Sequence, residues 1–181
     1  MKHFLFFFLI IAHVSCGGPE PRKPVKVKTG SILQKSVERN KDLLAKEEKQ
    51  IMEIIKNDST NTYFSSGIGS WYHYIYQNND SNYYPQTDDL VIMEYNVVSF
   101  SNDTIYSKEQ IGPITYKVDK QDLFPGLRNS IKLLKENESA TFLFPSSLAY
   151  GYHGDNNKIG VNIPIKSTIT ILKIDKQKDN N

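Results

Sequence analysis

The segment FPSSLAYGY (residues 144–152) raises the question that decides how the fold is read. It places two tyrosines around a glycine, directly after an apolar run and a Pro-Ser-Ser turn. Such a segment either packs its aromatic rings for purely structural reasons or forms one wall of a binding site. The sequence on both sides of the segment is needed to separate these two readings.

The composition is that of a globular domain with extensions. The chain has 181 residues, and a single domain commonly takes roughly 100–200 residues. Apolar residues make up 39% of the chain and aromatic residues 12%, which suits a core and favours strands. The net charge of +2 gives no strong field for nucleic acid, so no nucleic-acid partner is expected.

The first fifteen residues are expected to be a signal peptide and not part of the fold. Lys2 precedes an apolar run, residues 4–12, that is too short to span a bilayer as a helix. Ser15 then leads into Cys16, the only cysteine of the chain. This pattern resembles a bacterial lipoprotein signal, in which Cys16 becomes lipidated and anchors the protein to a membrane. The alternative is a plain secretory signal, and both take the protein out of the cytoplasm.

A tether and a long helix are predicted before the first strand. Residues 16–30 contain three prolines, which favour an extended linker. Over residues 31–57 apolar side chains recur at spacings of four and seven, and Ser31 can cap the helix that this pattern predicts. The stripe consists of Leu33, Val37, Leu44, Ile51 and Ile55. It can pack on the same domain or make a homodimer through residues 31–56, and the sequence leaves both open.

Residues 63–176 read as one α+β domain. Apolar, β-rich runs predict strands over residues 70–76, 90–100, 114–118, 140–144 and 163–174. Residues 124–135 return to helical spacing, with Leu127, Ile131 and Leu134 on one face and Pro125 near the helix start. Strands on both sides of one helix favour an antiparallel sheet wrapped around that helix.

The sequence lacks the motifs of metal and nucleophilic catalysis. Beyond the signal it holds only His73 and His153, which do not have metal-ligand spacing. There is no glycine-rich phosphate loop and no Gly-x-Ser-x-Gly motif. Asp88 and Asp89 lie in turn sequence, and His73 lies in an aromatic strand, so all three are read as structural. We therefore expect no metal and no cofactor.

Motifs between residues 85 and 175 resemble the C-terminal half of FKBP-type peptidyl-prolyl isomerases. They are DLFPGL (122–127), IKLLKENE (131–138), ATFLFP (140–145), LAYG (148–151), IP (163–164) and STITI (167–171). With the signal and the long helix, the chain is similar to FKBP-type lipoproteins linked to gliding motility in Bacteroidetes. The resemblance implies an antiparallel half-barrel of five or six strands around one short helix, with a cleft between helix and sheet.

The same resemblance assigns roles to individual residues. It implies that the Tyr150 ring walls the cleft and its hydroxyl meets a substrate carbonyl. The Phe124 backbone N–H would bind a second carbonyl, and Leu127 would form the floor; these three are the predicted catalytic residues. The predicted substrate-binding residues are Tyr95, Ile105, Tyr106, Ile114, Leu123, Ile163 and Ile171.

Three departures from the family pattern change the expected cleft. Leu127 replaces the usual tryptophan, and Tyr106 stands where an aspartate is usual. The loop of residues 152–162 lacks the usual His-Pro-Gly sequence and carries Asp155 and Lys158 among other polar residues. Some relatives with such changes have weak isomerase activity and serve as chaperones or scaffolds.

Such a cleft needs no nucleophile to act on a prolyl bond. Rotation about a peptide bond costs about 18–20 kcal/mol, and X-Pro isomers interconvert over tens of seconds or longer. Because the twisted amide is less dipolar than the planar one, a dry apolar site favours it. A thousandfold acceleration requires only about 4 kcal/mol.

Three functions are consistent with the sequence. The first is a prolyl isomerase that acts on X-Pro-containing exported polypeptides and is lipid-anchored in the cell envelope, facing the periplasm from the outer membrane. The second is a binding module that holds a motility or secretion partner without turnover. The third is a structural lipoprotein with an inert domain.

Overall fold

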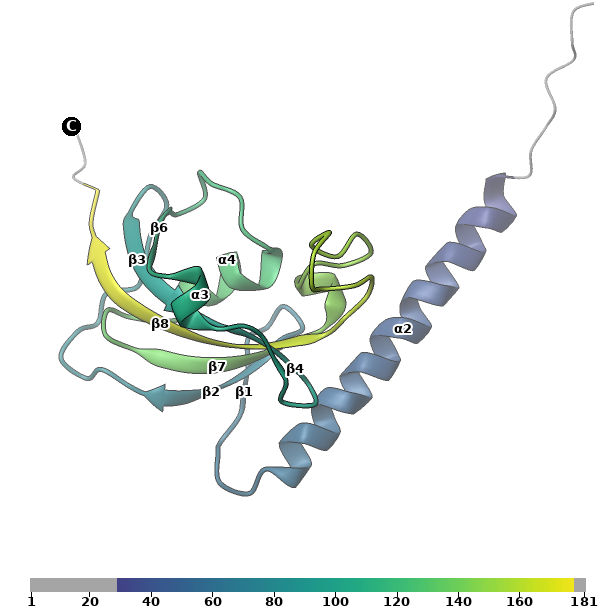
Figure 1. The fold of residues 1–181 in the computed structure, drawn as a ribbon, viewed down its shortest axis with the longest axis horizontal. Helices are drawn as coiled ribbons and strands as arrows, with labels where there is room; N and C mark the ends of the chain where they lie inside the picture. The colour runs from purple at the N-terminus through teal and green to yellow at the C-terminus, as the bar shows by residue number, and fades with distance from the viewer. Residues whose placement is uncertain (1–28, 178–181) are drawn as a thin grey trace, which may run out of the picture. The chain divides into compact units, whose positions relative to one another are not determined.

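The structure is a computed structural model and describes residues 29–177 (Figure 1). The predicted signal, Cys16 and all but the end of the predicted tether lie outside these residues. The chain divides into two units, residues 1–36 and 37–181. Within residues 29–177, no helix combines the length and the apolar character that a membrane crossing requires.

A continuous helix, α2, runs from Thr29 to Asn57. It contains Ser31, so the predicted N-cap at Ser31 is wrong: the helical backbone starts two residues earlier, a shift typical of helix ends. The apolar stripe is buried unevenly, since Ile51 is 1% exposed whereas Val37 is 52% exposed. Within the second unit, the stripe is therefore covered at Ile51 and open to solvent at Val37.

All strands among residues 29–177 belong to one antiparallel sheet of eight strands, which confirms the α+β fold. The order is β1-β2-β7-β8-β3-β6, and β4 pairs with β5 and β8. The bounds are β1 Phe64–Ser65, β2 Trp71–Tyr76, β3 Leu90–Tyr95, β4 Val97–Ser99, β5 Thr104–Tyr106, β6 Ile114–Lys117, β7 Ser139–Phe144 and β8 Ile165–Asp175.

The strand count exceeds the expected five or six for two reasons. β1 and β5 are short strands of two and three residues. The predicted strand over residues 90–100 also divides at Asn96, whose side-chain oxygen accepts the Thr168 amide at 2.7 Å while its own amide donates to the Thr168 carbonyl at 3.2 Å. The Asn96 side-chain oxygen thus takes the place of a backbone carbonyl in the pairing with β8.

The helices that follow the strands are short: α3 Lys108–Ile111, the 3₁₀ turn η2 Ser146–Leu148, and α4 Pro125–Ile131. The predicted helix over 124–135 is thus too long. After Ile131 the amides of Leu133 and Leu134 bond three residues back, to Ser130 and Ile131, so the chain tightens into a turn. Leu134 remains fully buried, which explains why its spacing read as helical.

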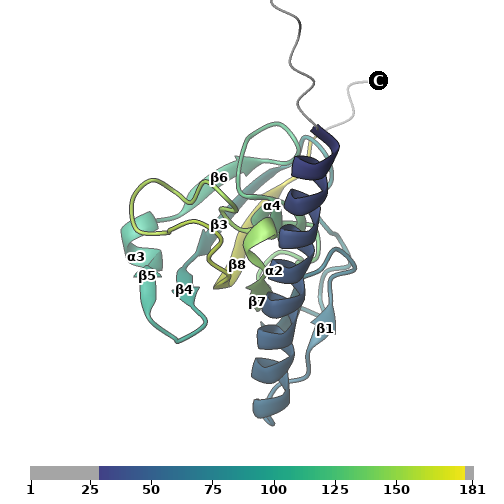
Figure 2. The ribbon, with the colours of Figure 1, turned by 90° about the vertical axis from the view of Figure 1, so that its right-hand side faces the viewer.

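α4 lies on the concave side of the curved sheet and forms the core with it (Figures 1 and 2). Alternate residues of β7 and β8 face α4, because successive side chains of a strand point to opposite faces. The core members from α4, the turn that follows it, β7 and β8 are Leu127, Ile131, Leu134, Ala140, Phe142, Phe144, Ile165, Ile169, Ile171 and Ile174. Gly126 allows the close packing: a Cβ there would lie 2.5 Å from Phe144 Cδ1 and 2.7 Å from the Leu148 carbonyl oxygen.

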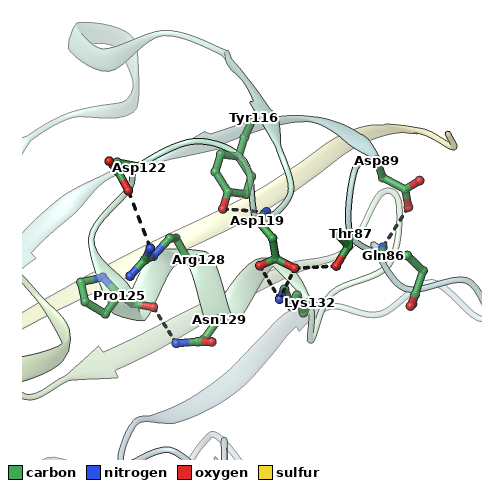
Figure 3. A network of polar contacts seen from close by, with 10 residues as sticks. All are labelled: Gln86, Thr87, Asp89, Tyr116, Asp119, Asp122, Pro125, Arg128, Asn129 and Lys132. Atoms are coloured by element: carbon green, nitrogen blue, oxygen red, sulfur yellow. Dashed lines mark hydrogen bonds and ion pairs between the residues drawn. The ribbon is translucent and has the colours of Figure 1, made fainter.

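Polar contacts hold the exposed side of α4 against the preceding loop (Figure 3). The Lys132 ammonium donates to both carboxylate oxygens of Asp119, at 2.6 and 2.8 Å, and Asp119 also accepts the Thr87 hydroxyl at 2.7 Å. Arg128 lies 3.8 Å from Asp122. Exposed pairs of this kind contribute only about 0–1 kcal/mol, so they serve to orient α4 more than to stabilise it.

Asp89 and His73 both have structural surroundings. Asp89 is 2% exposed and accepts the backbone amides of Gln86 and Gln177, each at 2.8 Å. His73 is buried in β2 with its ring 4.9 Å from that of Tyr63. In the described part of the chain, no group of three or more His, Cys, Asp or Glu side chains could hold a metal ion.

Candidate active site

Several of the predicted site residues lie around the start of α4: the Phe124 ring packs against those of Tyr95 and Tyr150, and Tyr106 is near enough to Tyr150 to affect its pKa. Those that are half-buried and pack against the core are Tyr95, Ile105, Tyr106, Ile114, Leu123, Phe124 and Tyr150. Leu127 and Ile171 belong to the fully buried core on which this group rests. Tyr95, Tyr106, Phe124 and Tyr150, which are far apart in the sequence, thus lie together, and we call them the aromatic cluster.

Phe124 lies at the centre of the aromatic cluster. Its ring centroid is 5.1 Å from that of Tyr150 and 6.3 Å from that of Tyr95. Phe124 is the N-cap residue of α4 with φ −60° and ψ 147°, the extended conformation that the following Pro125 imposes. Within residues 29–177 no acceptor is recorded for the Phe124 backbone N–H, so this donor is available to a ligand.

The Tyr150 side chain also carries an unengaged donor. Tyr150 follows η2, and Gly151 reverses the chain with φ +58°, a conformation that favours glycine. No partner for the Tyr150 hydroxyl is recorded in the described part of the chain, and its oxygen is not among the buried unpaired atoms there. Burial of the ring, with smaller contributions from Tyr95, Asp155 and Tyr106, raises the pKa of Tyr150. The hydroxyl is therefore a protonated, solvent-facing donor at neutral pH.

Tyr106, in contrast, is engaged within the protein. Its hydroxyl donates to the Asp155 carboxylate, and the Asn157 side-chain amide donates to the Tyr106 oxygen at 3.0 Å. The Lys158 ammonium lies 4.8 Å from the centre of the Tyr106 ring. The hydrogen bond to Asp155 raises the pKa of Tyr106. These contacts fasten the loop of residues 152–162 to β5.

The sequence did not single out Asp155 as a site residue. It lies 49 residues after Tyr106, and the concentration of polar side chains in its loop was the only sequence signal. Desolvation raises the pKa of Asp155, but hydrogen bonds from Tyr106 and from the Ile159 and Asn157 amides outweigh this effect and lower it. A charged carboxylate thus stands close to the aromatic cluster.

Three predicted site residues have placements that differ from the half-buried group. Leu127 and Ile171 have no exposed surface, so they support the aromatic cluster from below. Ile163 is 38% exposed and lines a pocket with Leu43 and Glu47 of α2. The contacts on record thus associate Ile163 with α2 and not with the aromatic cluster.

The arrangement is suited to holding an apolar ring beside a carbonyl group. The surface is aromatic and aliphatic, and it has two unengaged donors, the Phe124 N–H and the Tyr150 O–H. Such a surface can bind an apolar ring and stabilise a partly desolvated polar group beside it.

Comparison with protein families gives a match to the FKBP-type peptidyl-prolyl cis-trans isomerases over residues 82–172. The chain belongs to this family. All ten predicted site residues, from Tyr95 to Ile171, fall within the FKBP match, and α2, β1 and β2 precede it.

A curated relative agrees with the FKBP assignment, and a solved structure shares the fold. The chain is 32% identical over 143 residues to a probable FKBP-type peptidyl-prolyl cis-trans isomerase, FkpA, of Neisseria meningitidis serogroup B. The alignment covers 77% of this chain and 51% of the relative, so the chain spans about half the length of that protein. The fold is similar to the N-terminal domain of FKBP42 from Arabidopsis thaliana, with a TM-score of 0.58, 14% identity, and coverage of 66% of this chain and 96% of that domain.

Proposed function

We propose that the protein is a prolyl isomerase that accelerates cis-trans exchange of X-Pro bonds in exported polypeptides. The observation that carries the proposal is the aromatic cluster, where two unengaged donors flank half-buried rings inside the FKBP match. The proline ring would lie against Phe124, Tyr95 and Tyr150. The Phe124 N–H and the Tyr150 hydroxyl would bind substrate carbonyls.

The mechanism is preferential binding of the twisted amide. A planar X-Pro amide loses hydration when it enters an apolar site, and the less dipolar twisted amide loses less, so the barrier falls. Hydrogen bonds to the neighbouring carbonyls hold the segment while the prolyl bond rotates. A thousandfold acceleration would require the site to favour the twisted form by about 4 kcal/mol.

A protease-coupled assay on short X-Pro peptides tests this proposal. Wild-type protein should speed the cis-trans step in proportion to its concentration, and substitution of Tyr150 or Leu127 should reduce the effect. The absence of any acceleration over the uncatalysed rate, with folded protein and several residues tried before proline, would overturn the proposed activity.

A second candidate is a binding module of the same fold with little turnover. Two observations favour it: Leu127, at the position where the family usually has tryptophan, has no exposed surface to offer a substrate, and Tyr106 is tied to Asp155 instead of being open to a substrate. This candidate predicts binding of proline-containing segments without accelerated exchange. Titration of a peptide that leaves the exchange rate unchanged would support it over the enzyme.

We also propose that the protein acts in the cell envelope, lipid-anchored through Cys16 and serving gliding motility or the folding of outer-membrane and periplasmic clients. The support is the N-terminal sequence, with its short apolar run before a single cysteine. Metabolic labelling with a clickable fatty acid should mark wild-type protein and not Cys16→Ala. Equal labelling of both would remove the anchor from the proposal.

Pairing of two copies through residues 31–56 is part of the same proposal. The exposed apolar side chains Val37, Leu44 and Met52 of α2 support it. Sedimentation equilibrium should give a dimer mass that falls to the monomer mass in Val37→Lys/Leu44→Lys. A monomer mass for wild-type protein at high concentration would contradict the pairing.

A further inference from the structure

A carboxylate of α2 is buried against the segment that carries Tyr150. Glu47 is 3% exposed, whereas its neighbour Glu48 is exposed. The Glu47 Oε2 accepts the backbone N–H of Ser146 at 2.8 Å, across 99 residues of sequence. A pocket of about 190 Å³ lies beside this contact, lined by Glu47 and Leu44 on one side and Ser146 and Tyr152 on the other.

Ser146 is the residue through which this contact reaches Tyr150. It is the first residue of η2 and is itself buried. Its carbonyl accepts the amide of Ala149 at 3.0 Å and that of Gly151 at 2.9 Å. The residues immediately before and after Tyr150 are therefore both bonded to Ser146, and Glu47 fixes Ser146 from the opposite side.

The energetics of Glu47 argue against a role in general stability. Its second oxygen, Oε1, is buried and has no recorded partner among residues 29–177. Burial of a carboxylate with one oxygen unpaired is unfavourable, and a glutamine could accept the same Ser146 amide at a smaller desolvation cost. What the carboxylate supplies is a short, charge-assisted bond to one backbone amide, which is stronger and more directional than a neutral one.

We propose that Glu47 is a positioning residue for prolyl isomerisation, holding the Tyr150 segment in place through Ser146. The proposal rests on the proposed isomerase activity and deepens it. It makes the second half of α2, which lies outside the FKBP match, a working part of the active site. Glu47 touches no substrate and acts only through the backbone of residues 146–151.

Four variants separate positioning from a loss of stability. Glu47→Ala removes the acceptor, and Glu47→Gln keeps an oxygen for the Ser146 amide. Glu48→Ala is the matched control, because Glu48 is an exposed neighbour on the same helix. Ile174→Val is the stability control, since it trims a buried side chain at the far end of β8 from Ser146.

Two measurements are made on each full-length variant: kcat/KM on an X-Pro peptide, and amide hydrogen exchange across the chain. Glu47→Ala should lower kcat/KM by about ten- to hundredfold, the effect of losing one hydrogen bond to a charged group. Exchange at residues 146–152 should rise by about the same factor, with core strands unchanged. Glu47→Gln should restore both to within about threefold of wild type, and Glu48→Ala and Ile174→Val should leave residues 146–152 as in wild type.

Several outcomes would contradict the inference. Wild-type kcat/KM in Glu47→Ala, a uniform rise in exchange, or a Glu47→Gln variant as impaired as Glu47→Ala would each overturn the positioning role. If wild-type protein shows no turnover at all, the proposed function fails. The role of Glu47 in isomerisation then fails with it. Hydrogen exchange decides separately whether Glu47 holds the Tyr150 segment in place: a selective rise at residues 146–152 in Glu47→Ala shows that it does, and a uniform rise shows that it does not.

Discussion

Replacement of Tyr150 by phenylalanine isolates the one hydroxyl that the proposed mechanism uses. The ring stays, so its contact with Phe124 at 5.1 Å and its packing against the core are kept. No recorded hydrogen bond within residues 29–177 is lost, so the free energy of unfolding should change by no more than about 0.5 kcal/mol. The lost interaction is one neutral hydrogen bond to substrate, about 0.5–1.5 kcal/mol, which lowers kcat/KM about two- to tenfold.

The assay compares kcat/KM and thermal unfolding for wild type, Tyr150→Phe and Tyr106→Phe. Tyr106→Phe is the contrasting variant, because the Tyr106 hydroxyl already donates to Asp155 and is not offered to substrate. The reasoning predicts that Tyr150→Phe loses activity without losing stability. It is refuted if Tyr150→Phe keeps full activity, or if its activity falls only in step with a lowered melting temperature.

Further predictions concern the core, the close packing of α4 and the response to alkali. Leu127→Ala, at a position with no exposed surface, should lower the free energy of unfolding by about 2–5 kcal/mol in urea titration; a change below about 1 kcal/mol would contradict its burial. Gly126→Ala should cost about 2 kcal/mol or more, because the new Cβ would lie 2.7 Å from a backbone oxygen; a wild-type melting temperature would show that α4 can shift freely. Burial and the Asp58 hydrogen bond raise the pKa of Tyr63 from 10.0 to about 12, and burial raises that of Tyr150. The stability linked to these tyrosines should be fully present below about pH 10 and be lost as the pH rises toward their pKa values in the folded protein. A free energy of unfolding that does not decline between about pH 8 and 11 would contradict this direction.

The fold was predictable because its signals are local. The period-two runs mark the strands, and the Pro125–Gly126 pair marks the start of α4. The end of α4 was misplaced because Leu134 keeps a helical spacing while it sits in a turn. The break at Asn96 was missed because it depends on a bond to Thr168, more than seventy residues away.

Only those residues of the candidate site that lie in family motifs could be predicted from the sequence. Phe124 and Tyr150 lie in motifs that the family resemblance covers, and the structure brings them into ring contact. Asp155 and Glu47 were missed, since an acidic residue in a polar loop or on a helix is normally solvent-exposed. Their partners, Tyr106 and Ser146, lie 49 and 99 residues away, so only the folded chain shows that they are engaged.

The central claim is that the aromatic cluster both binds a prolyl segment and speeds its isomerisation. Nuclear magnetic resonance on isotope-labelled protein with a short X-Pro peptide measures both at once, through cis-trans exchange of the peptide and shift changes in the protein. We predict accelerated exchange, with the largest shift changes at Tyr95, Phe124 and Tyr150. Unaccelerated exchange, or accelerated exchange with shift changes confined to residues outside this cluster, would contradict the account.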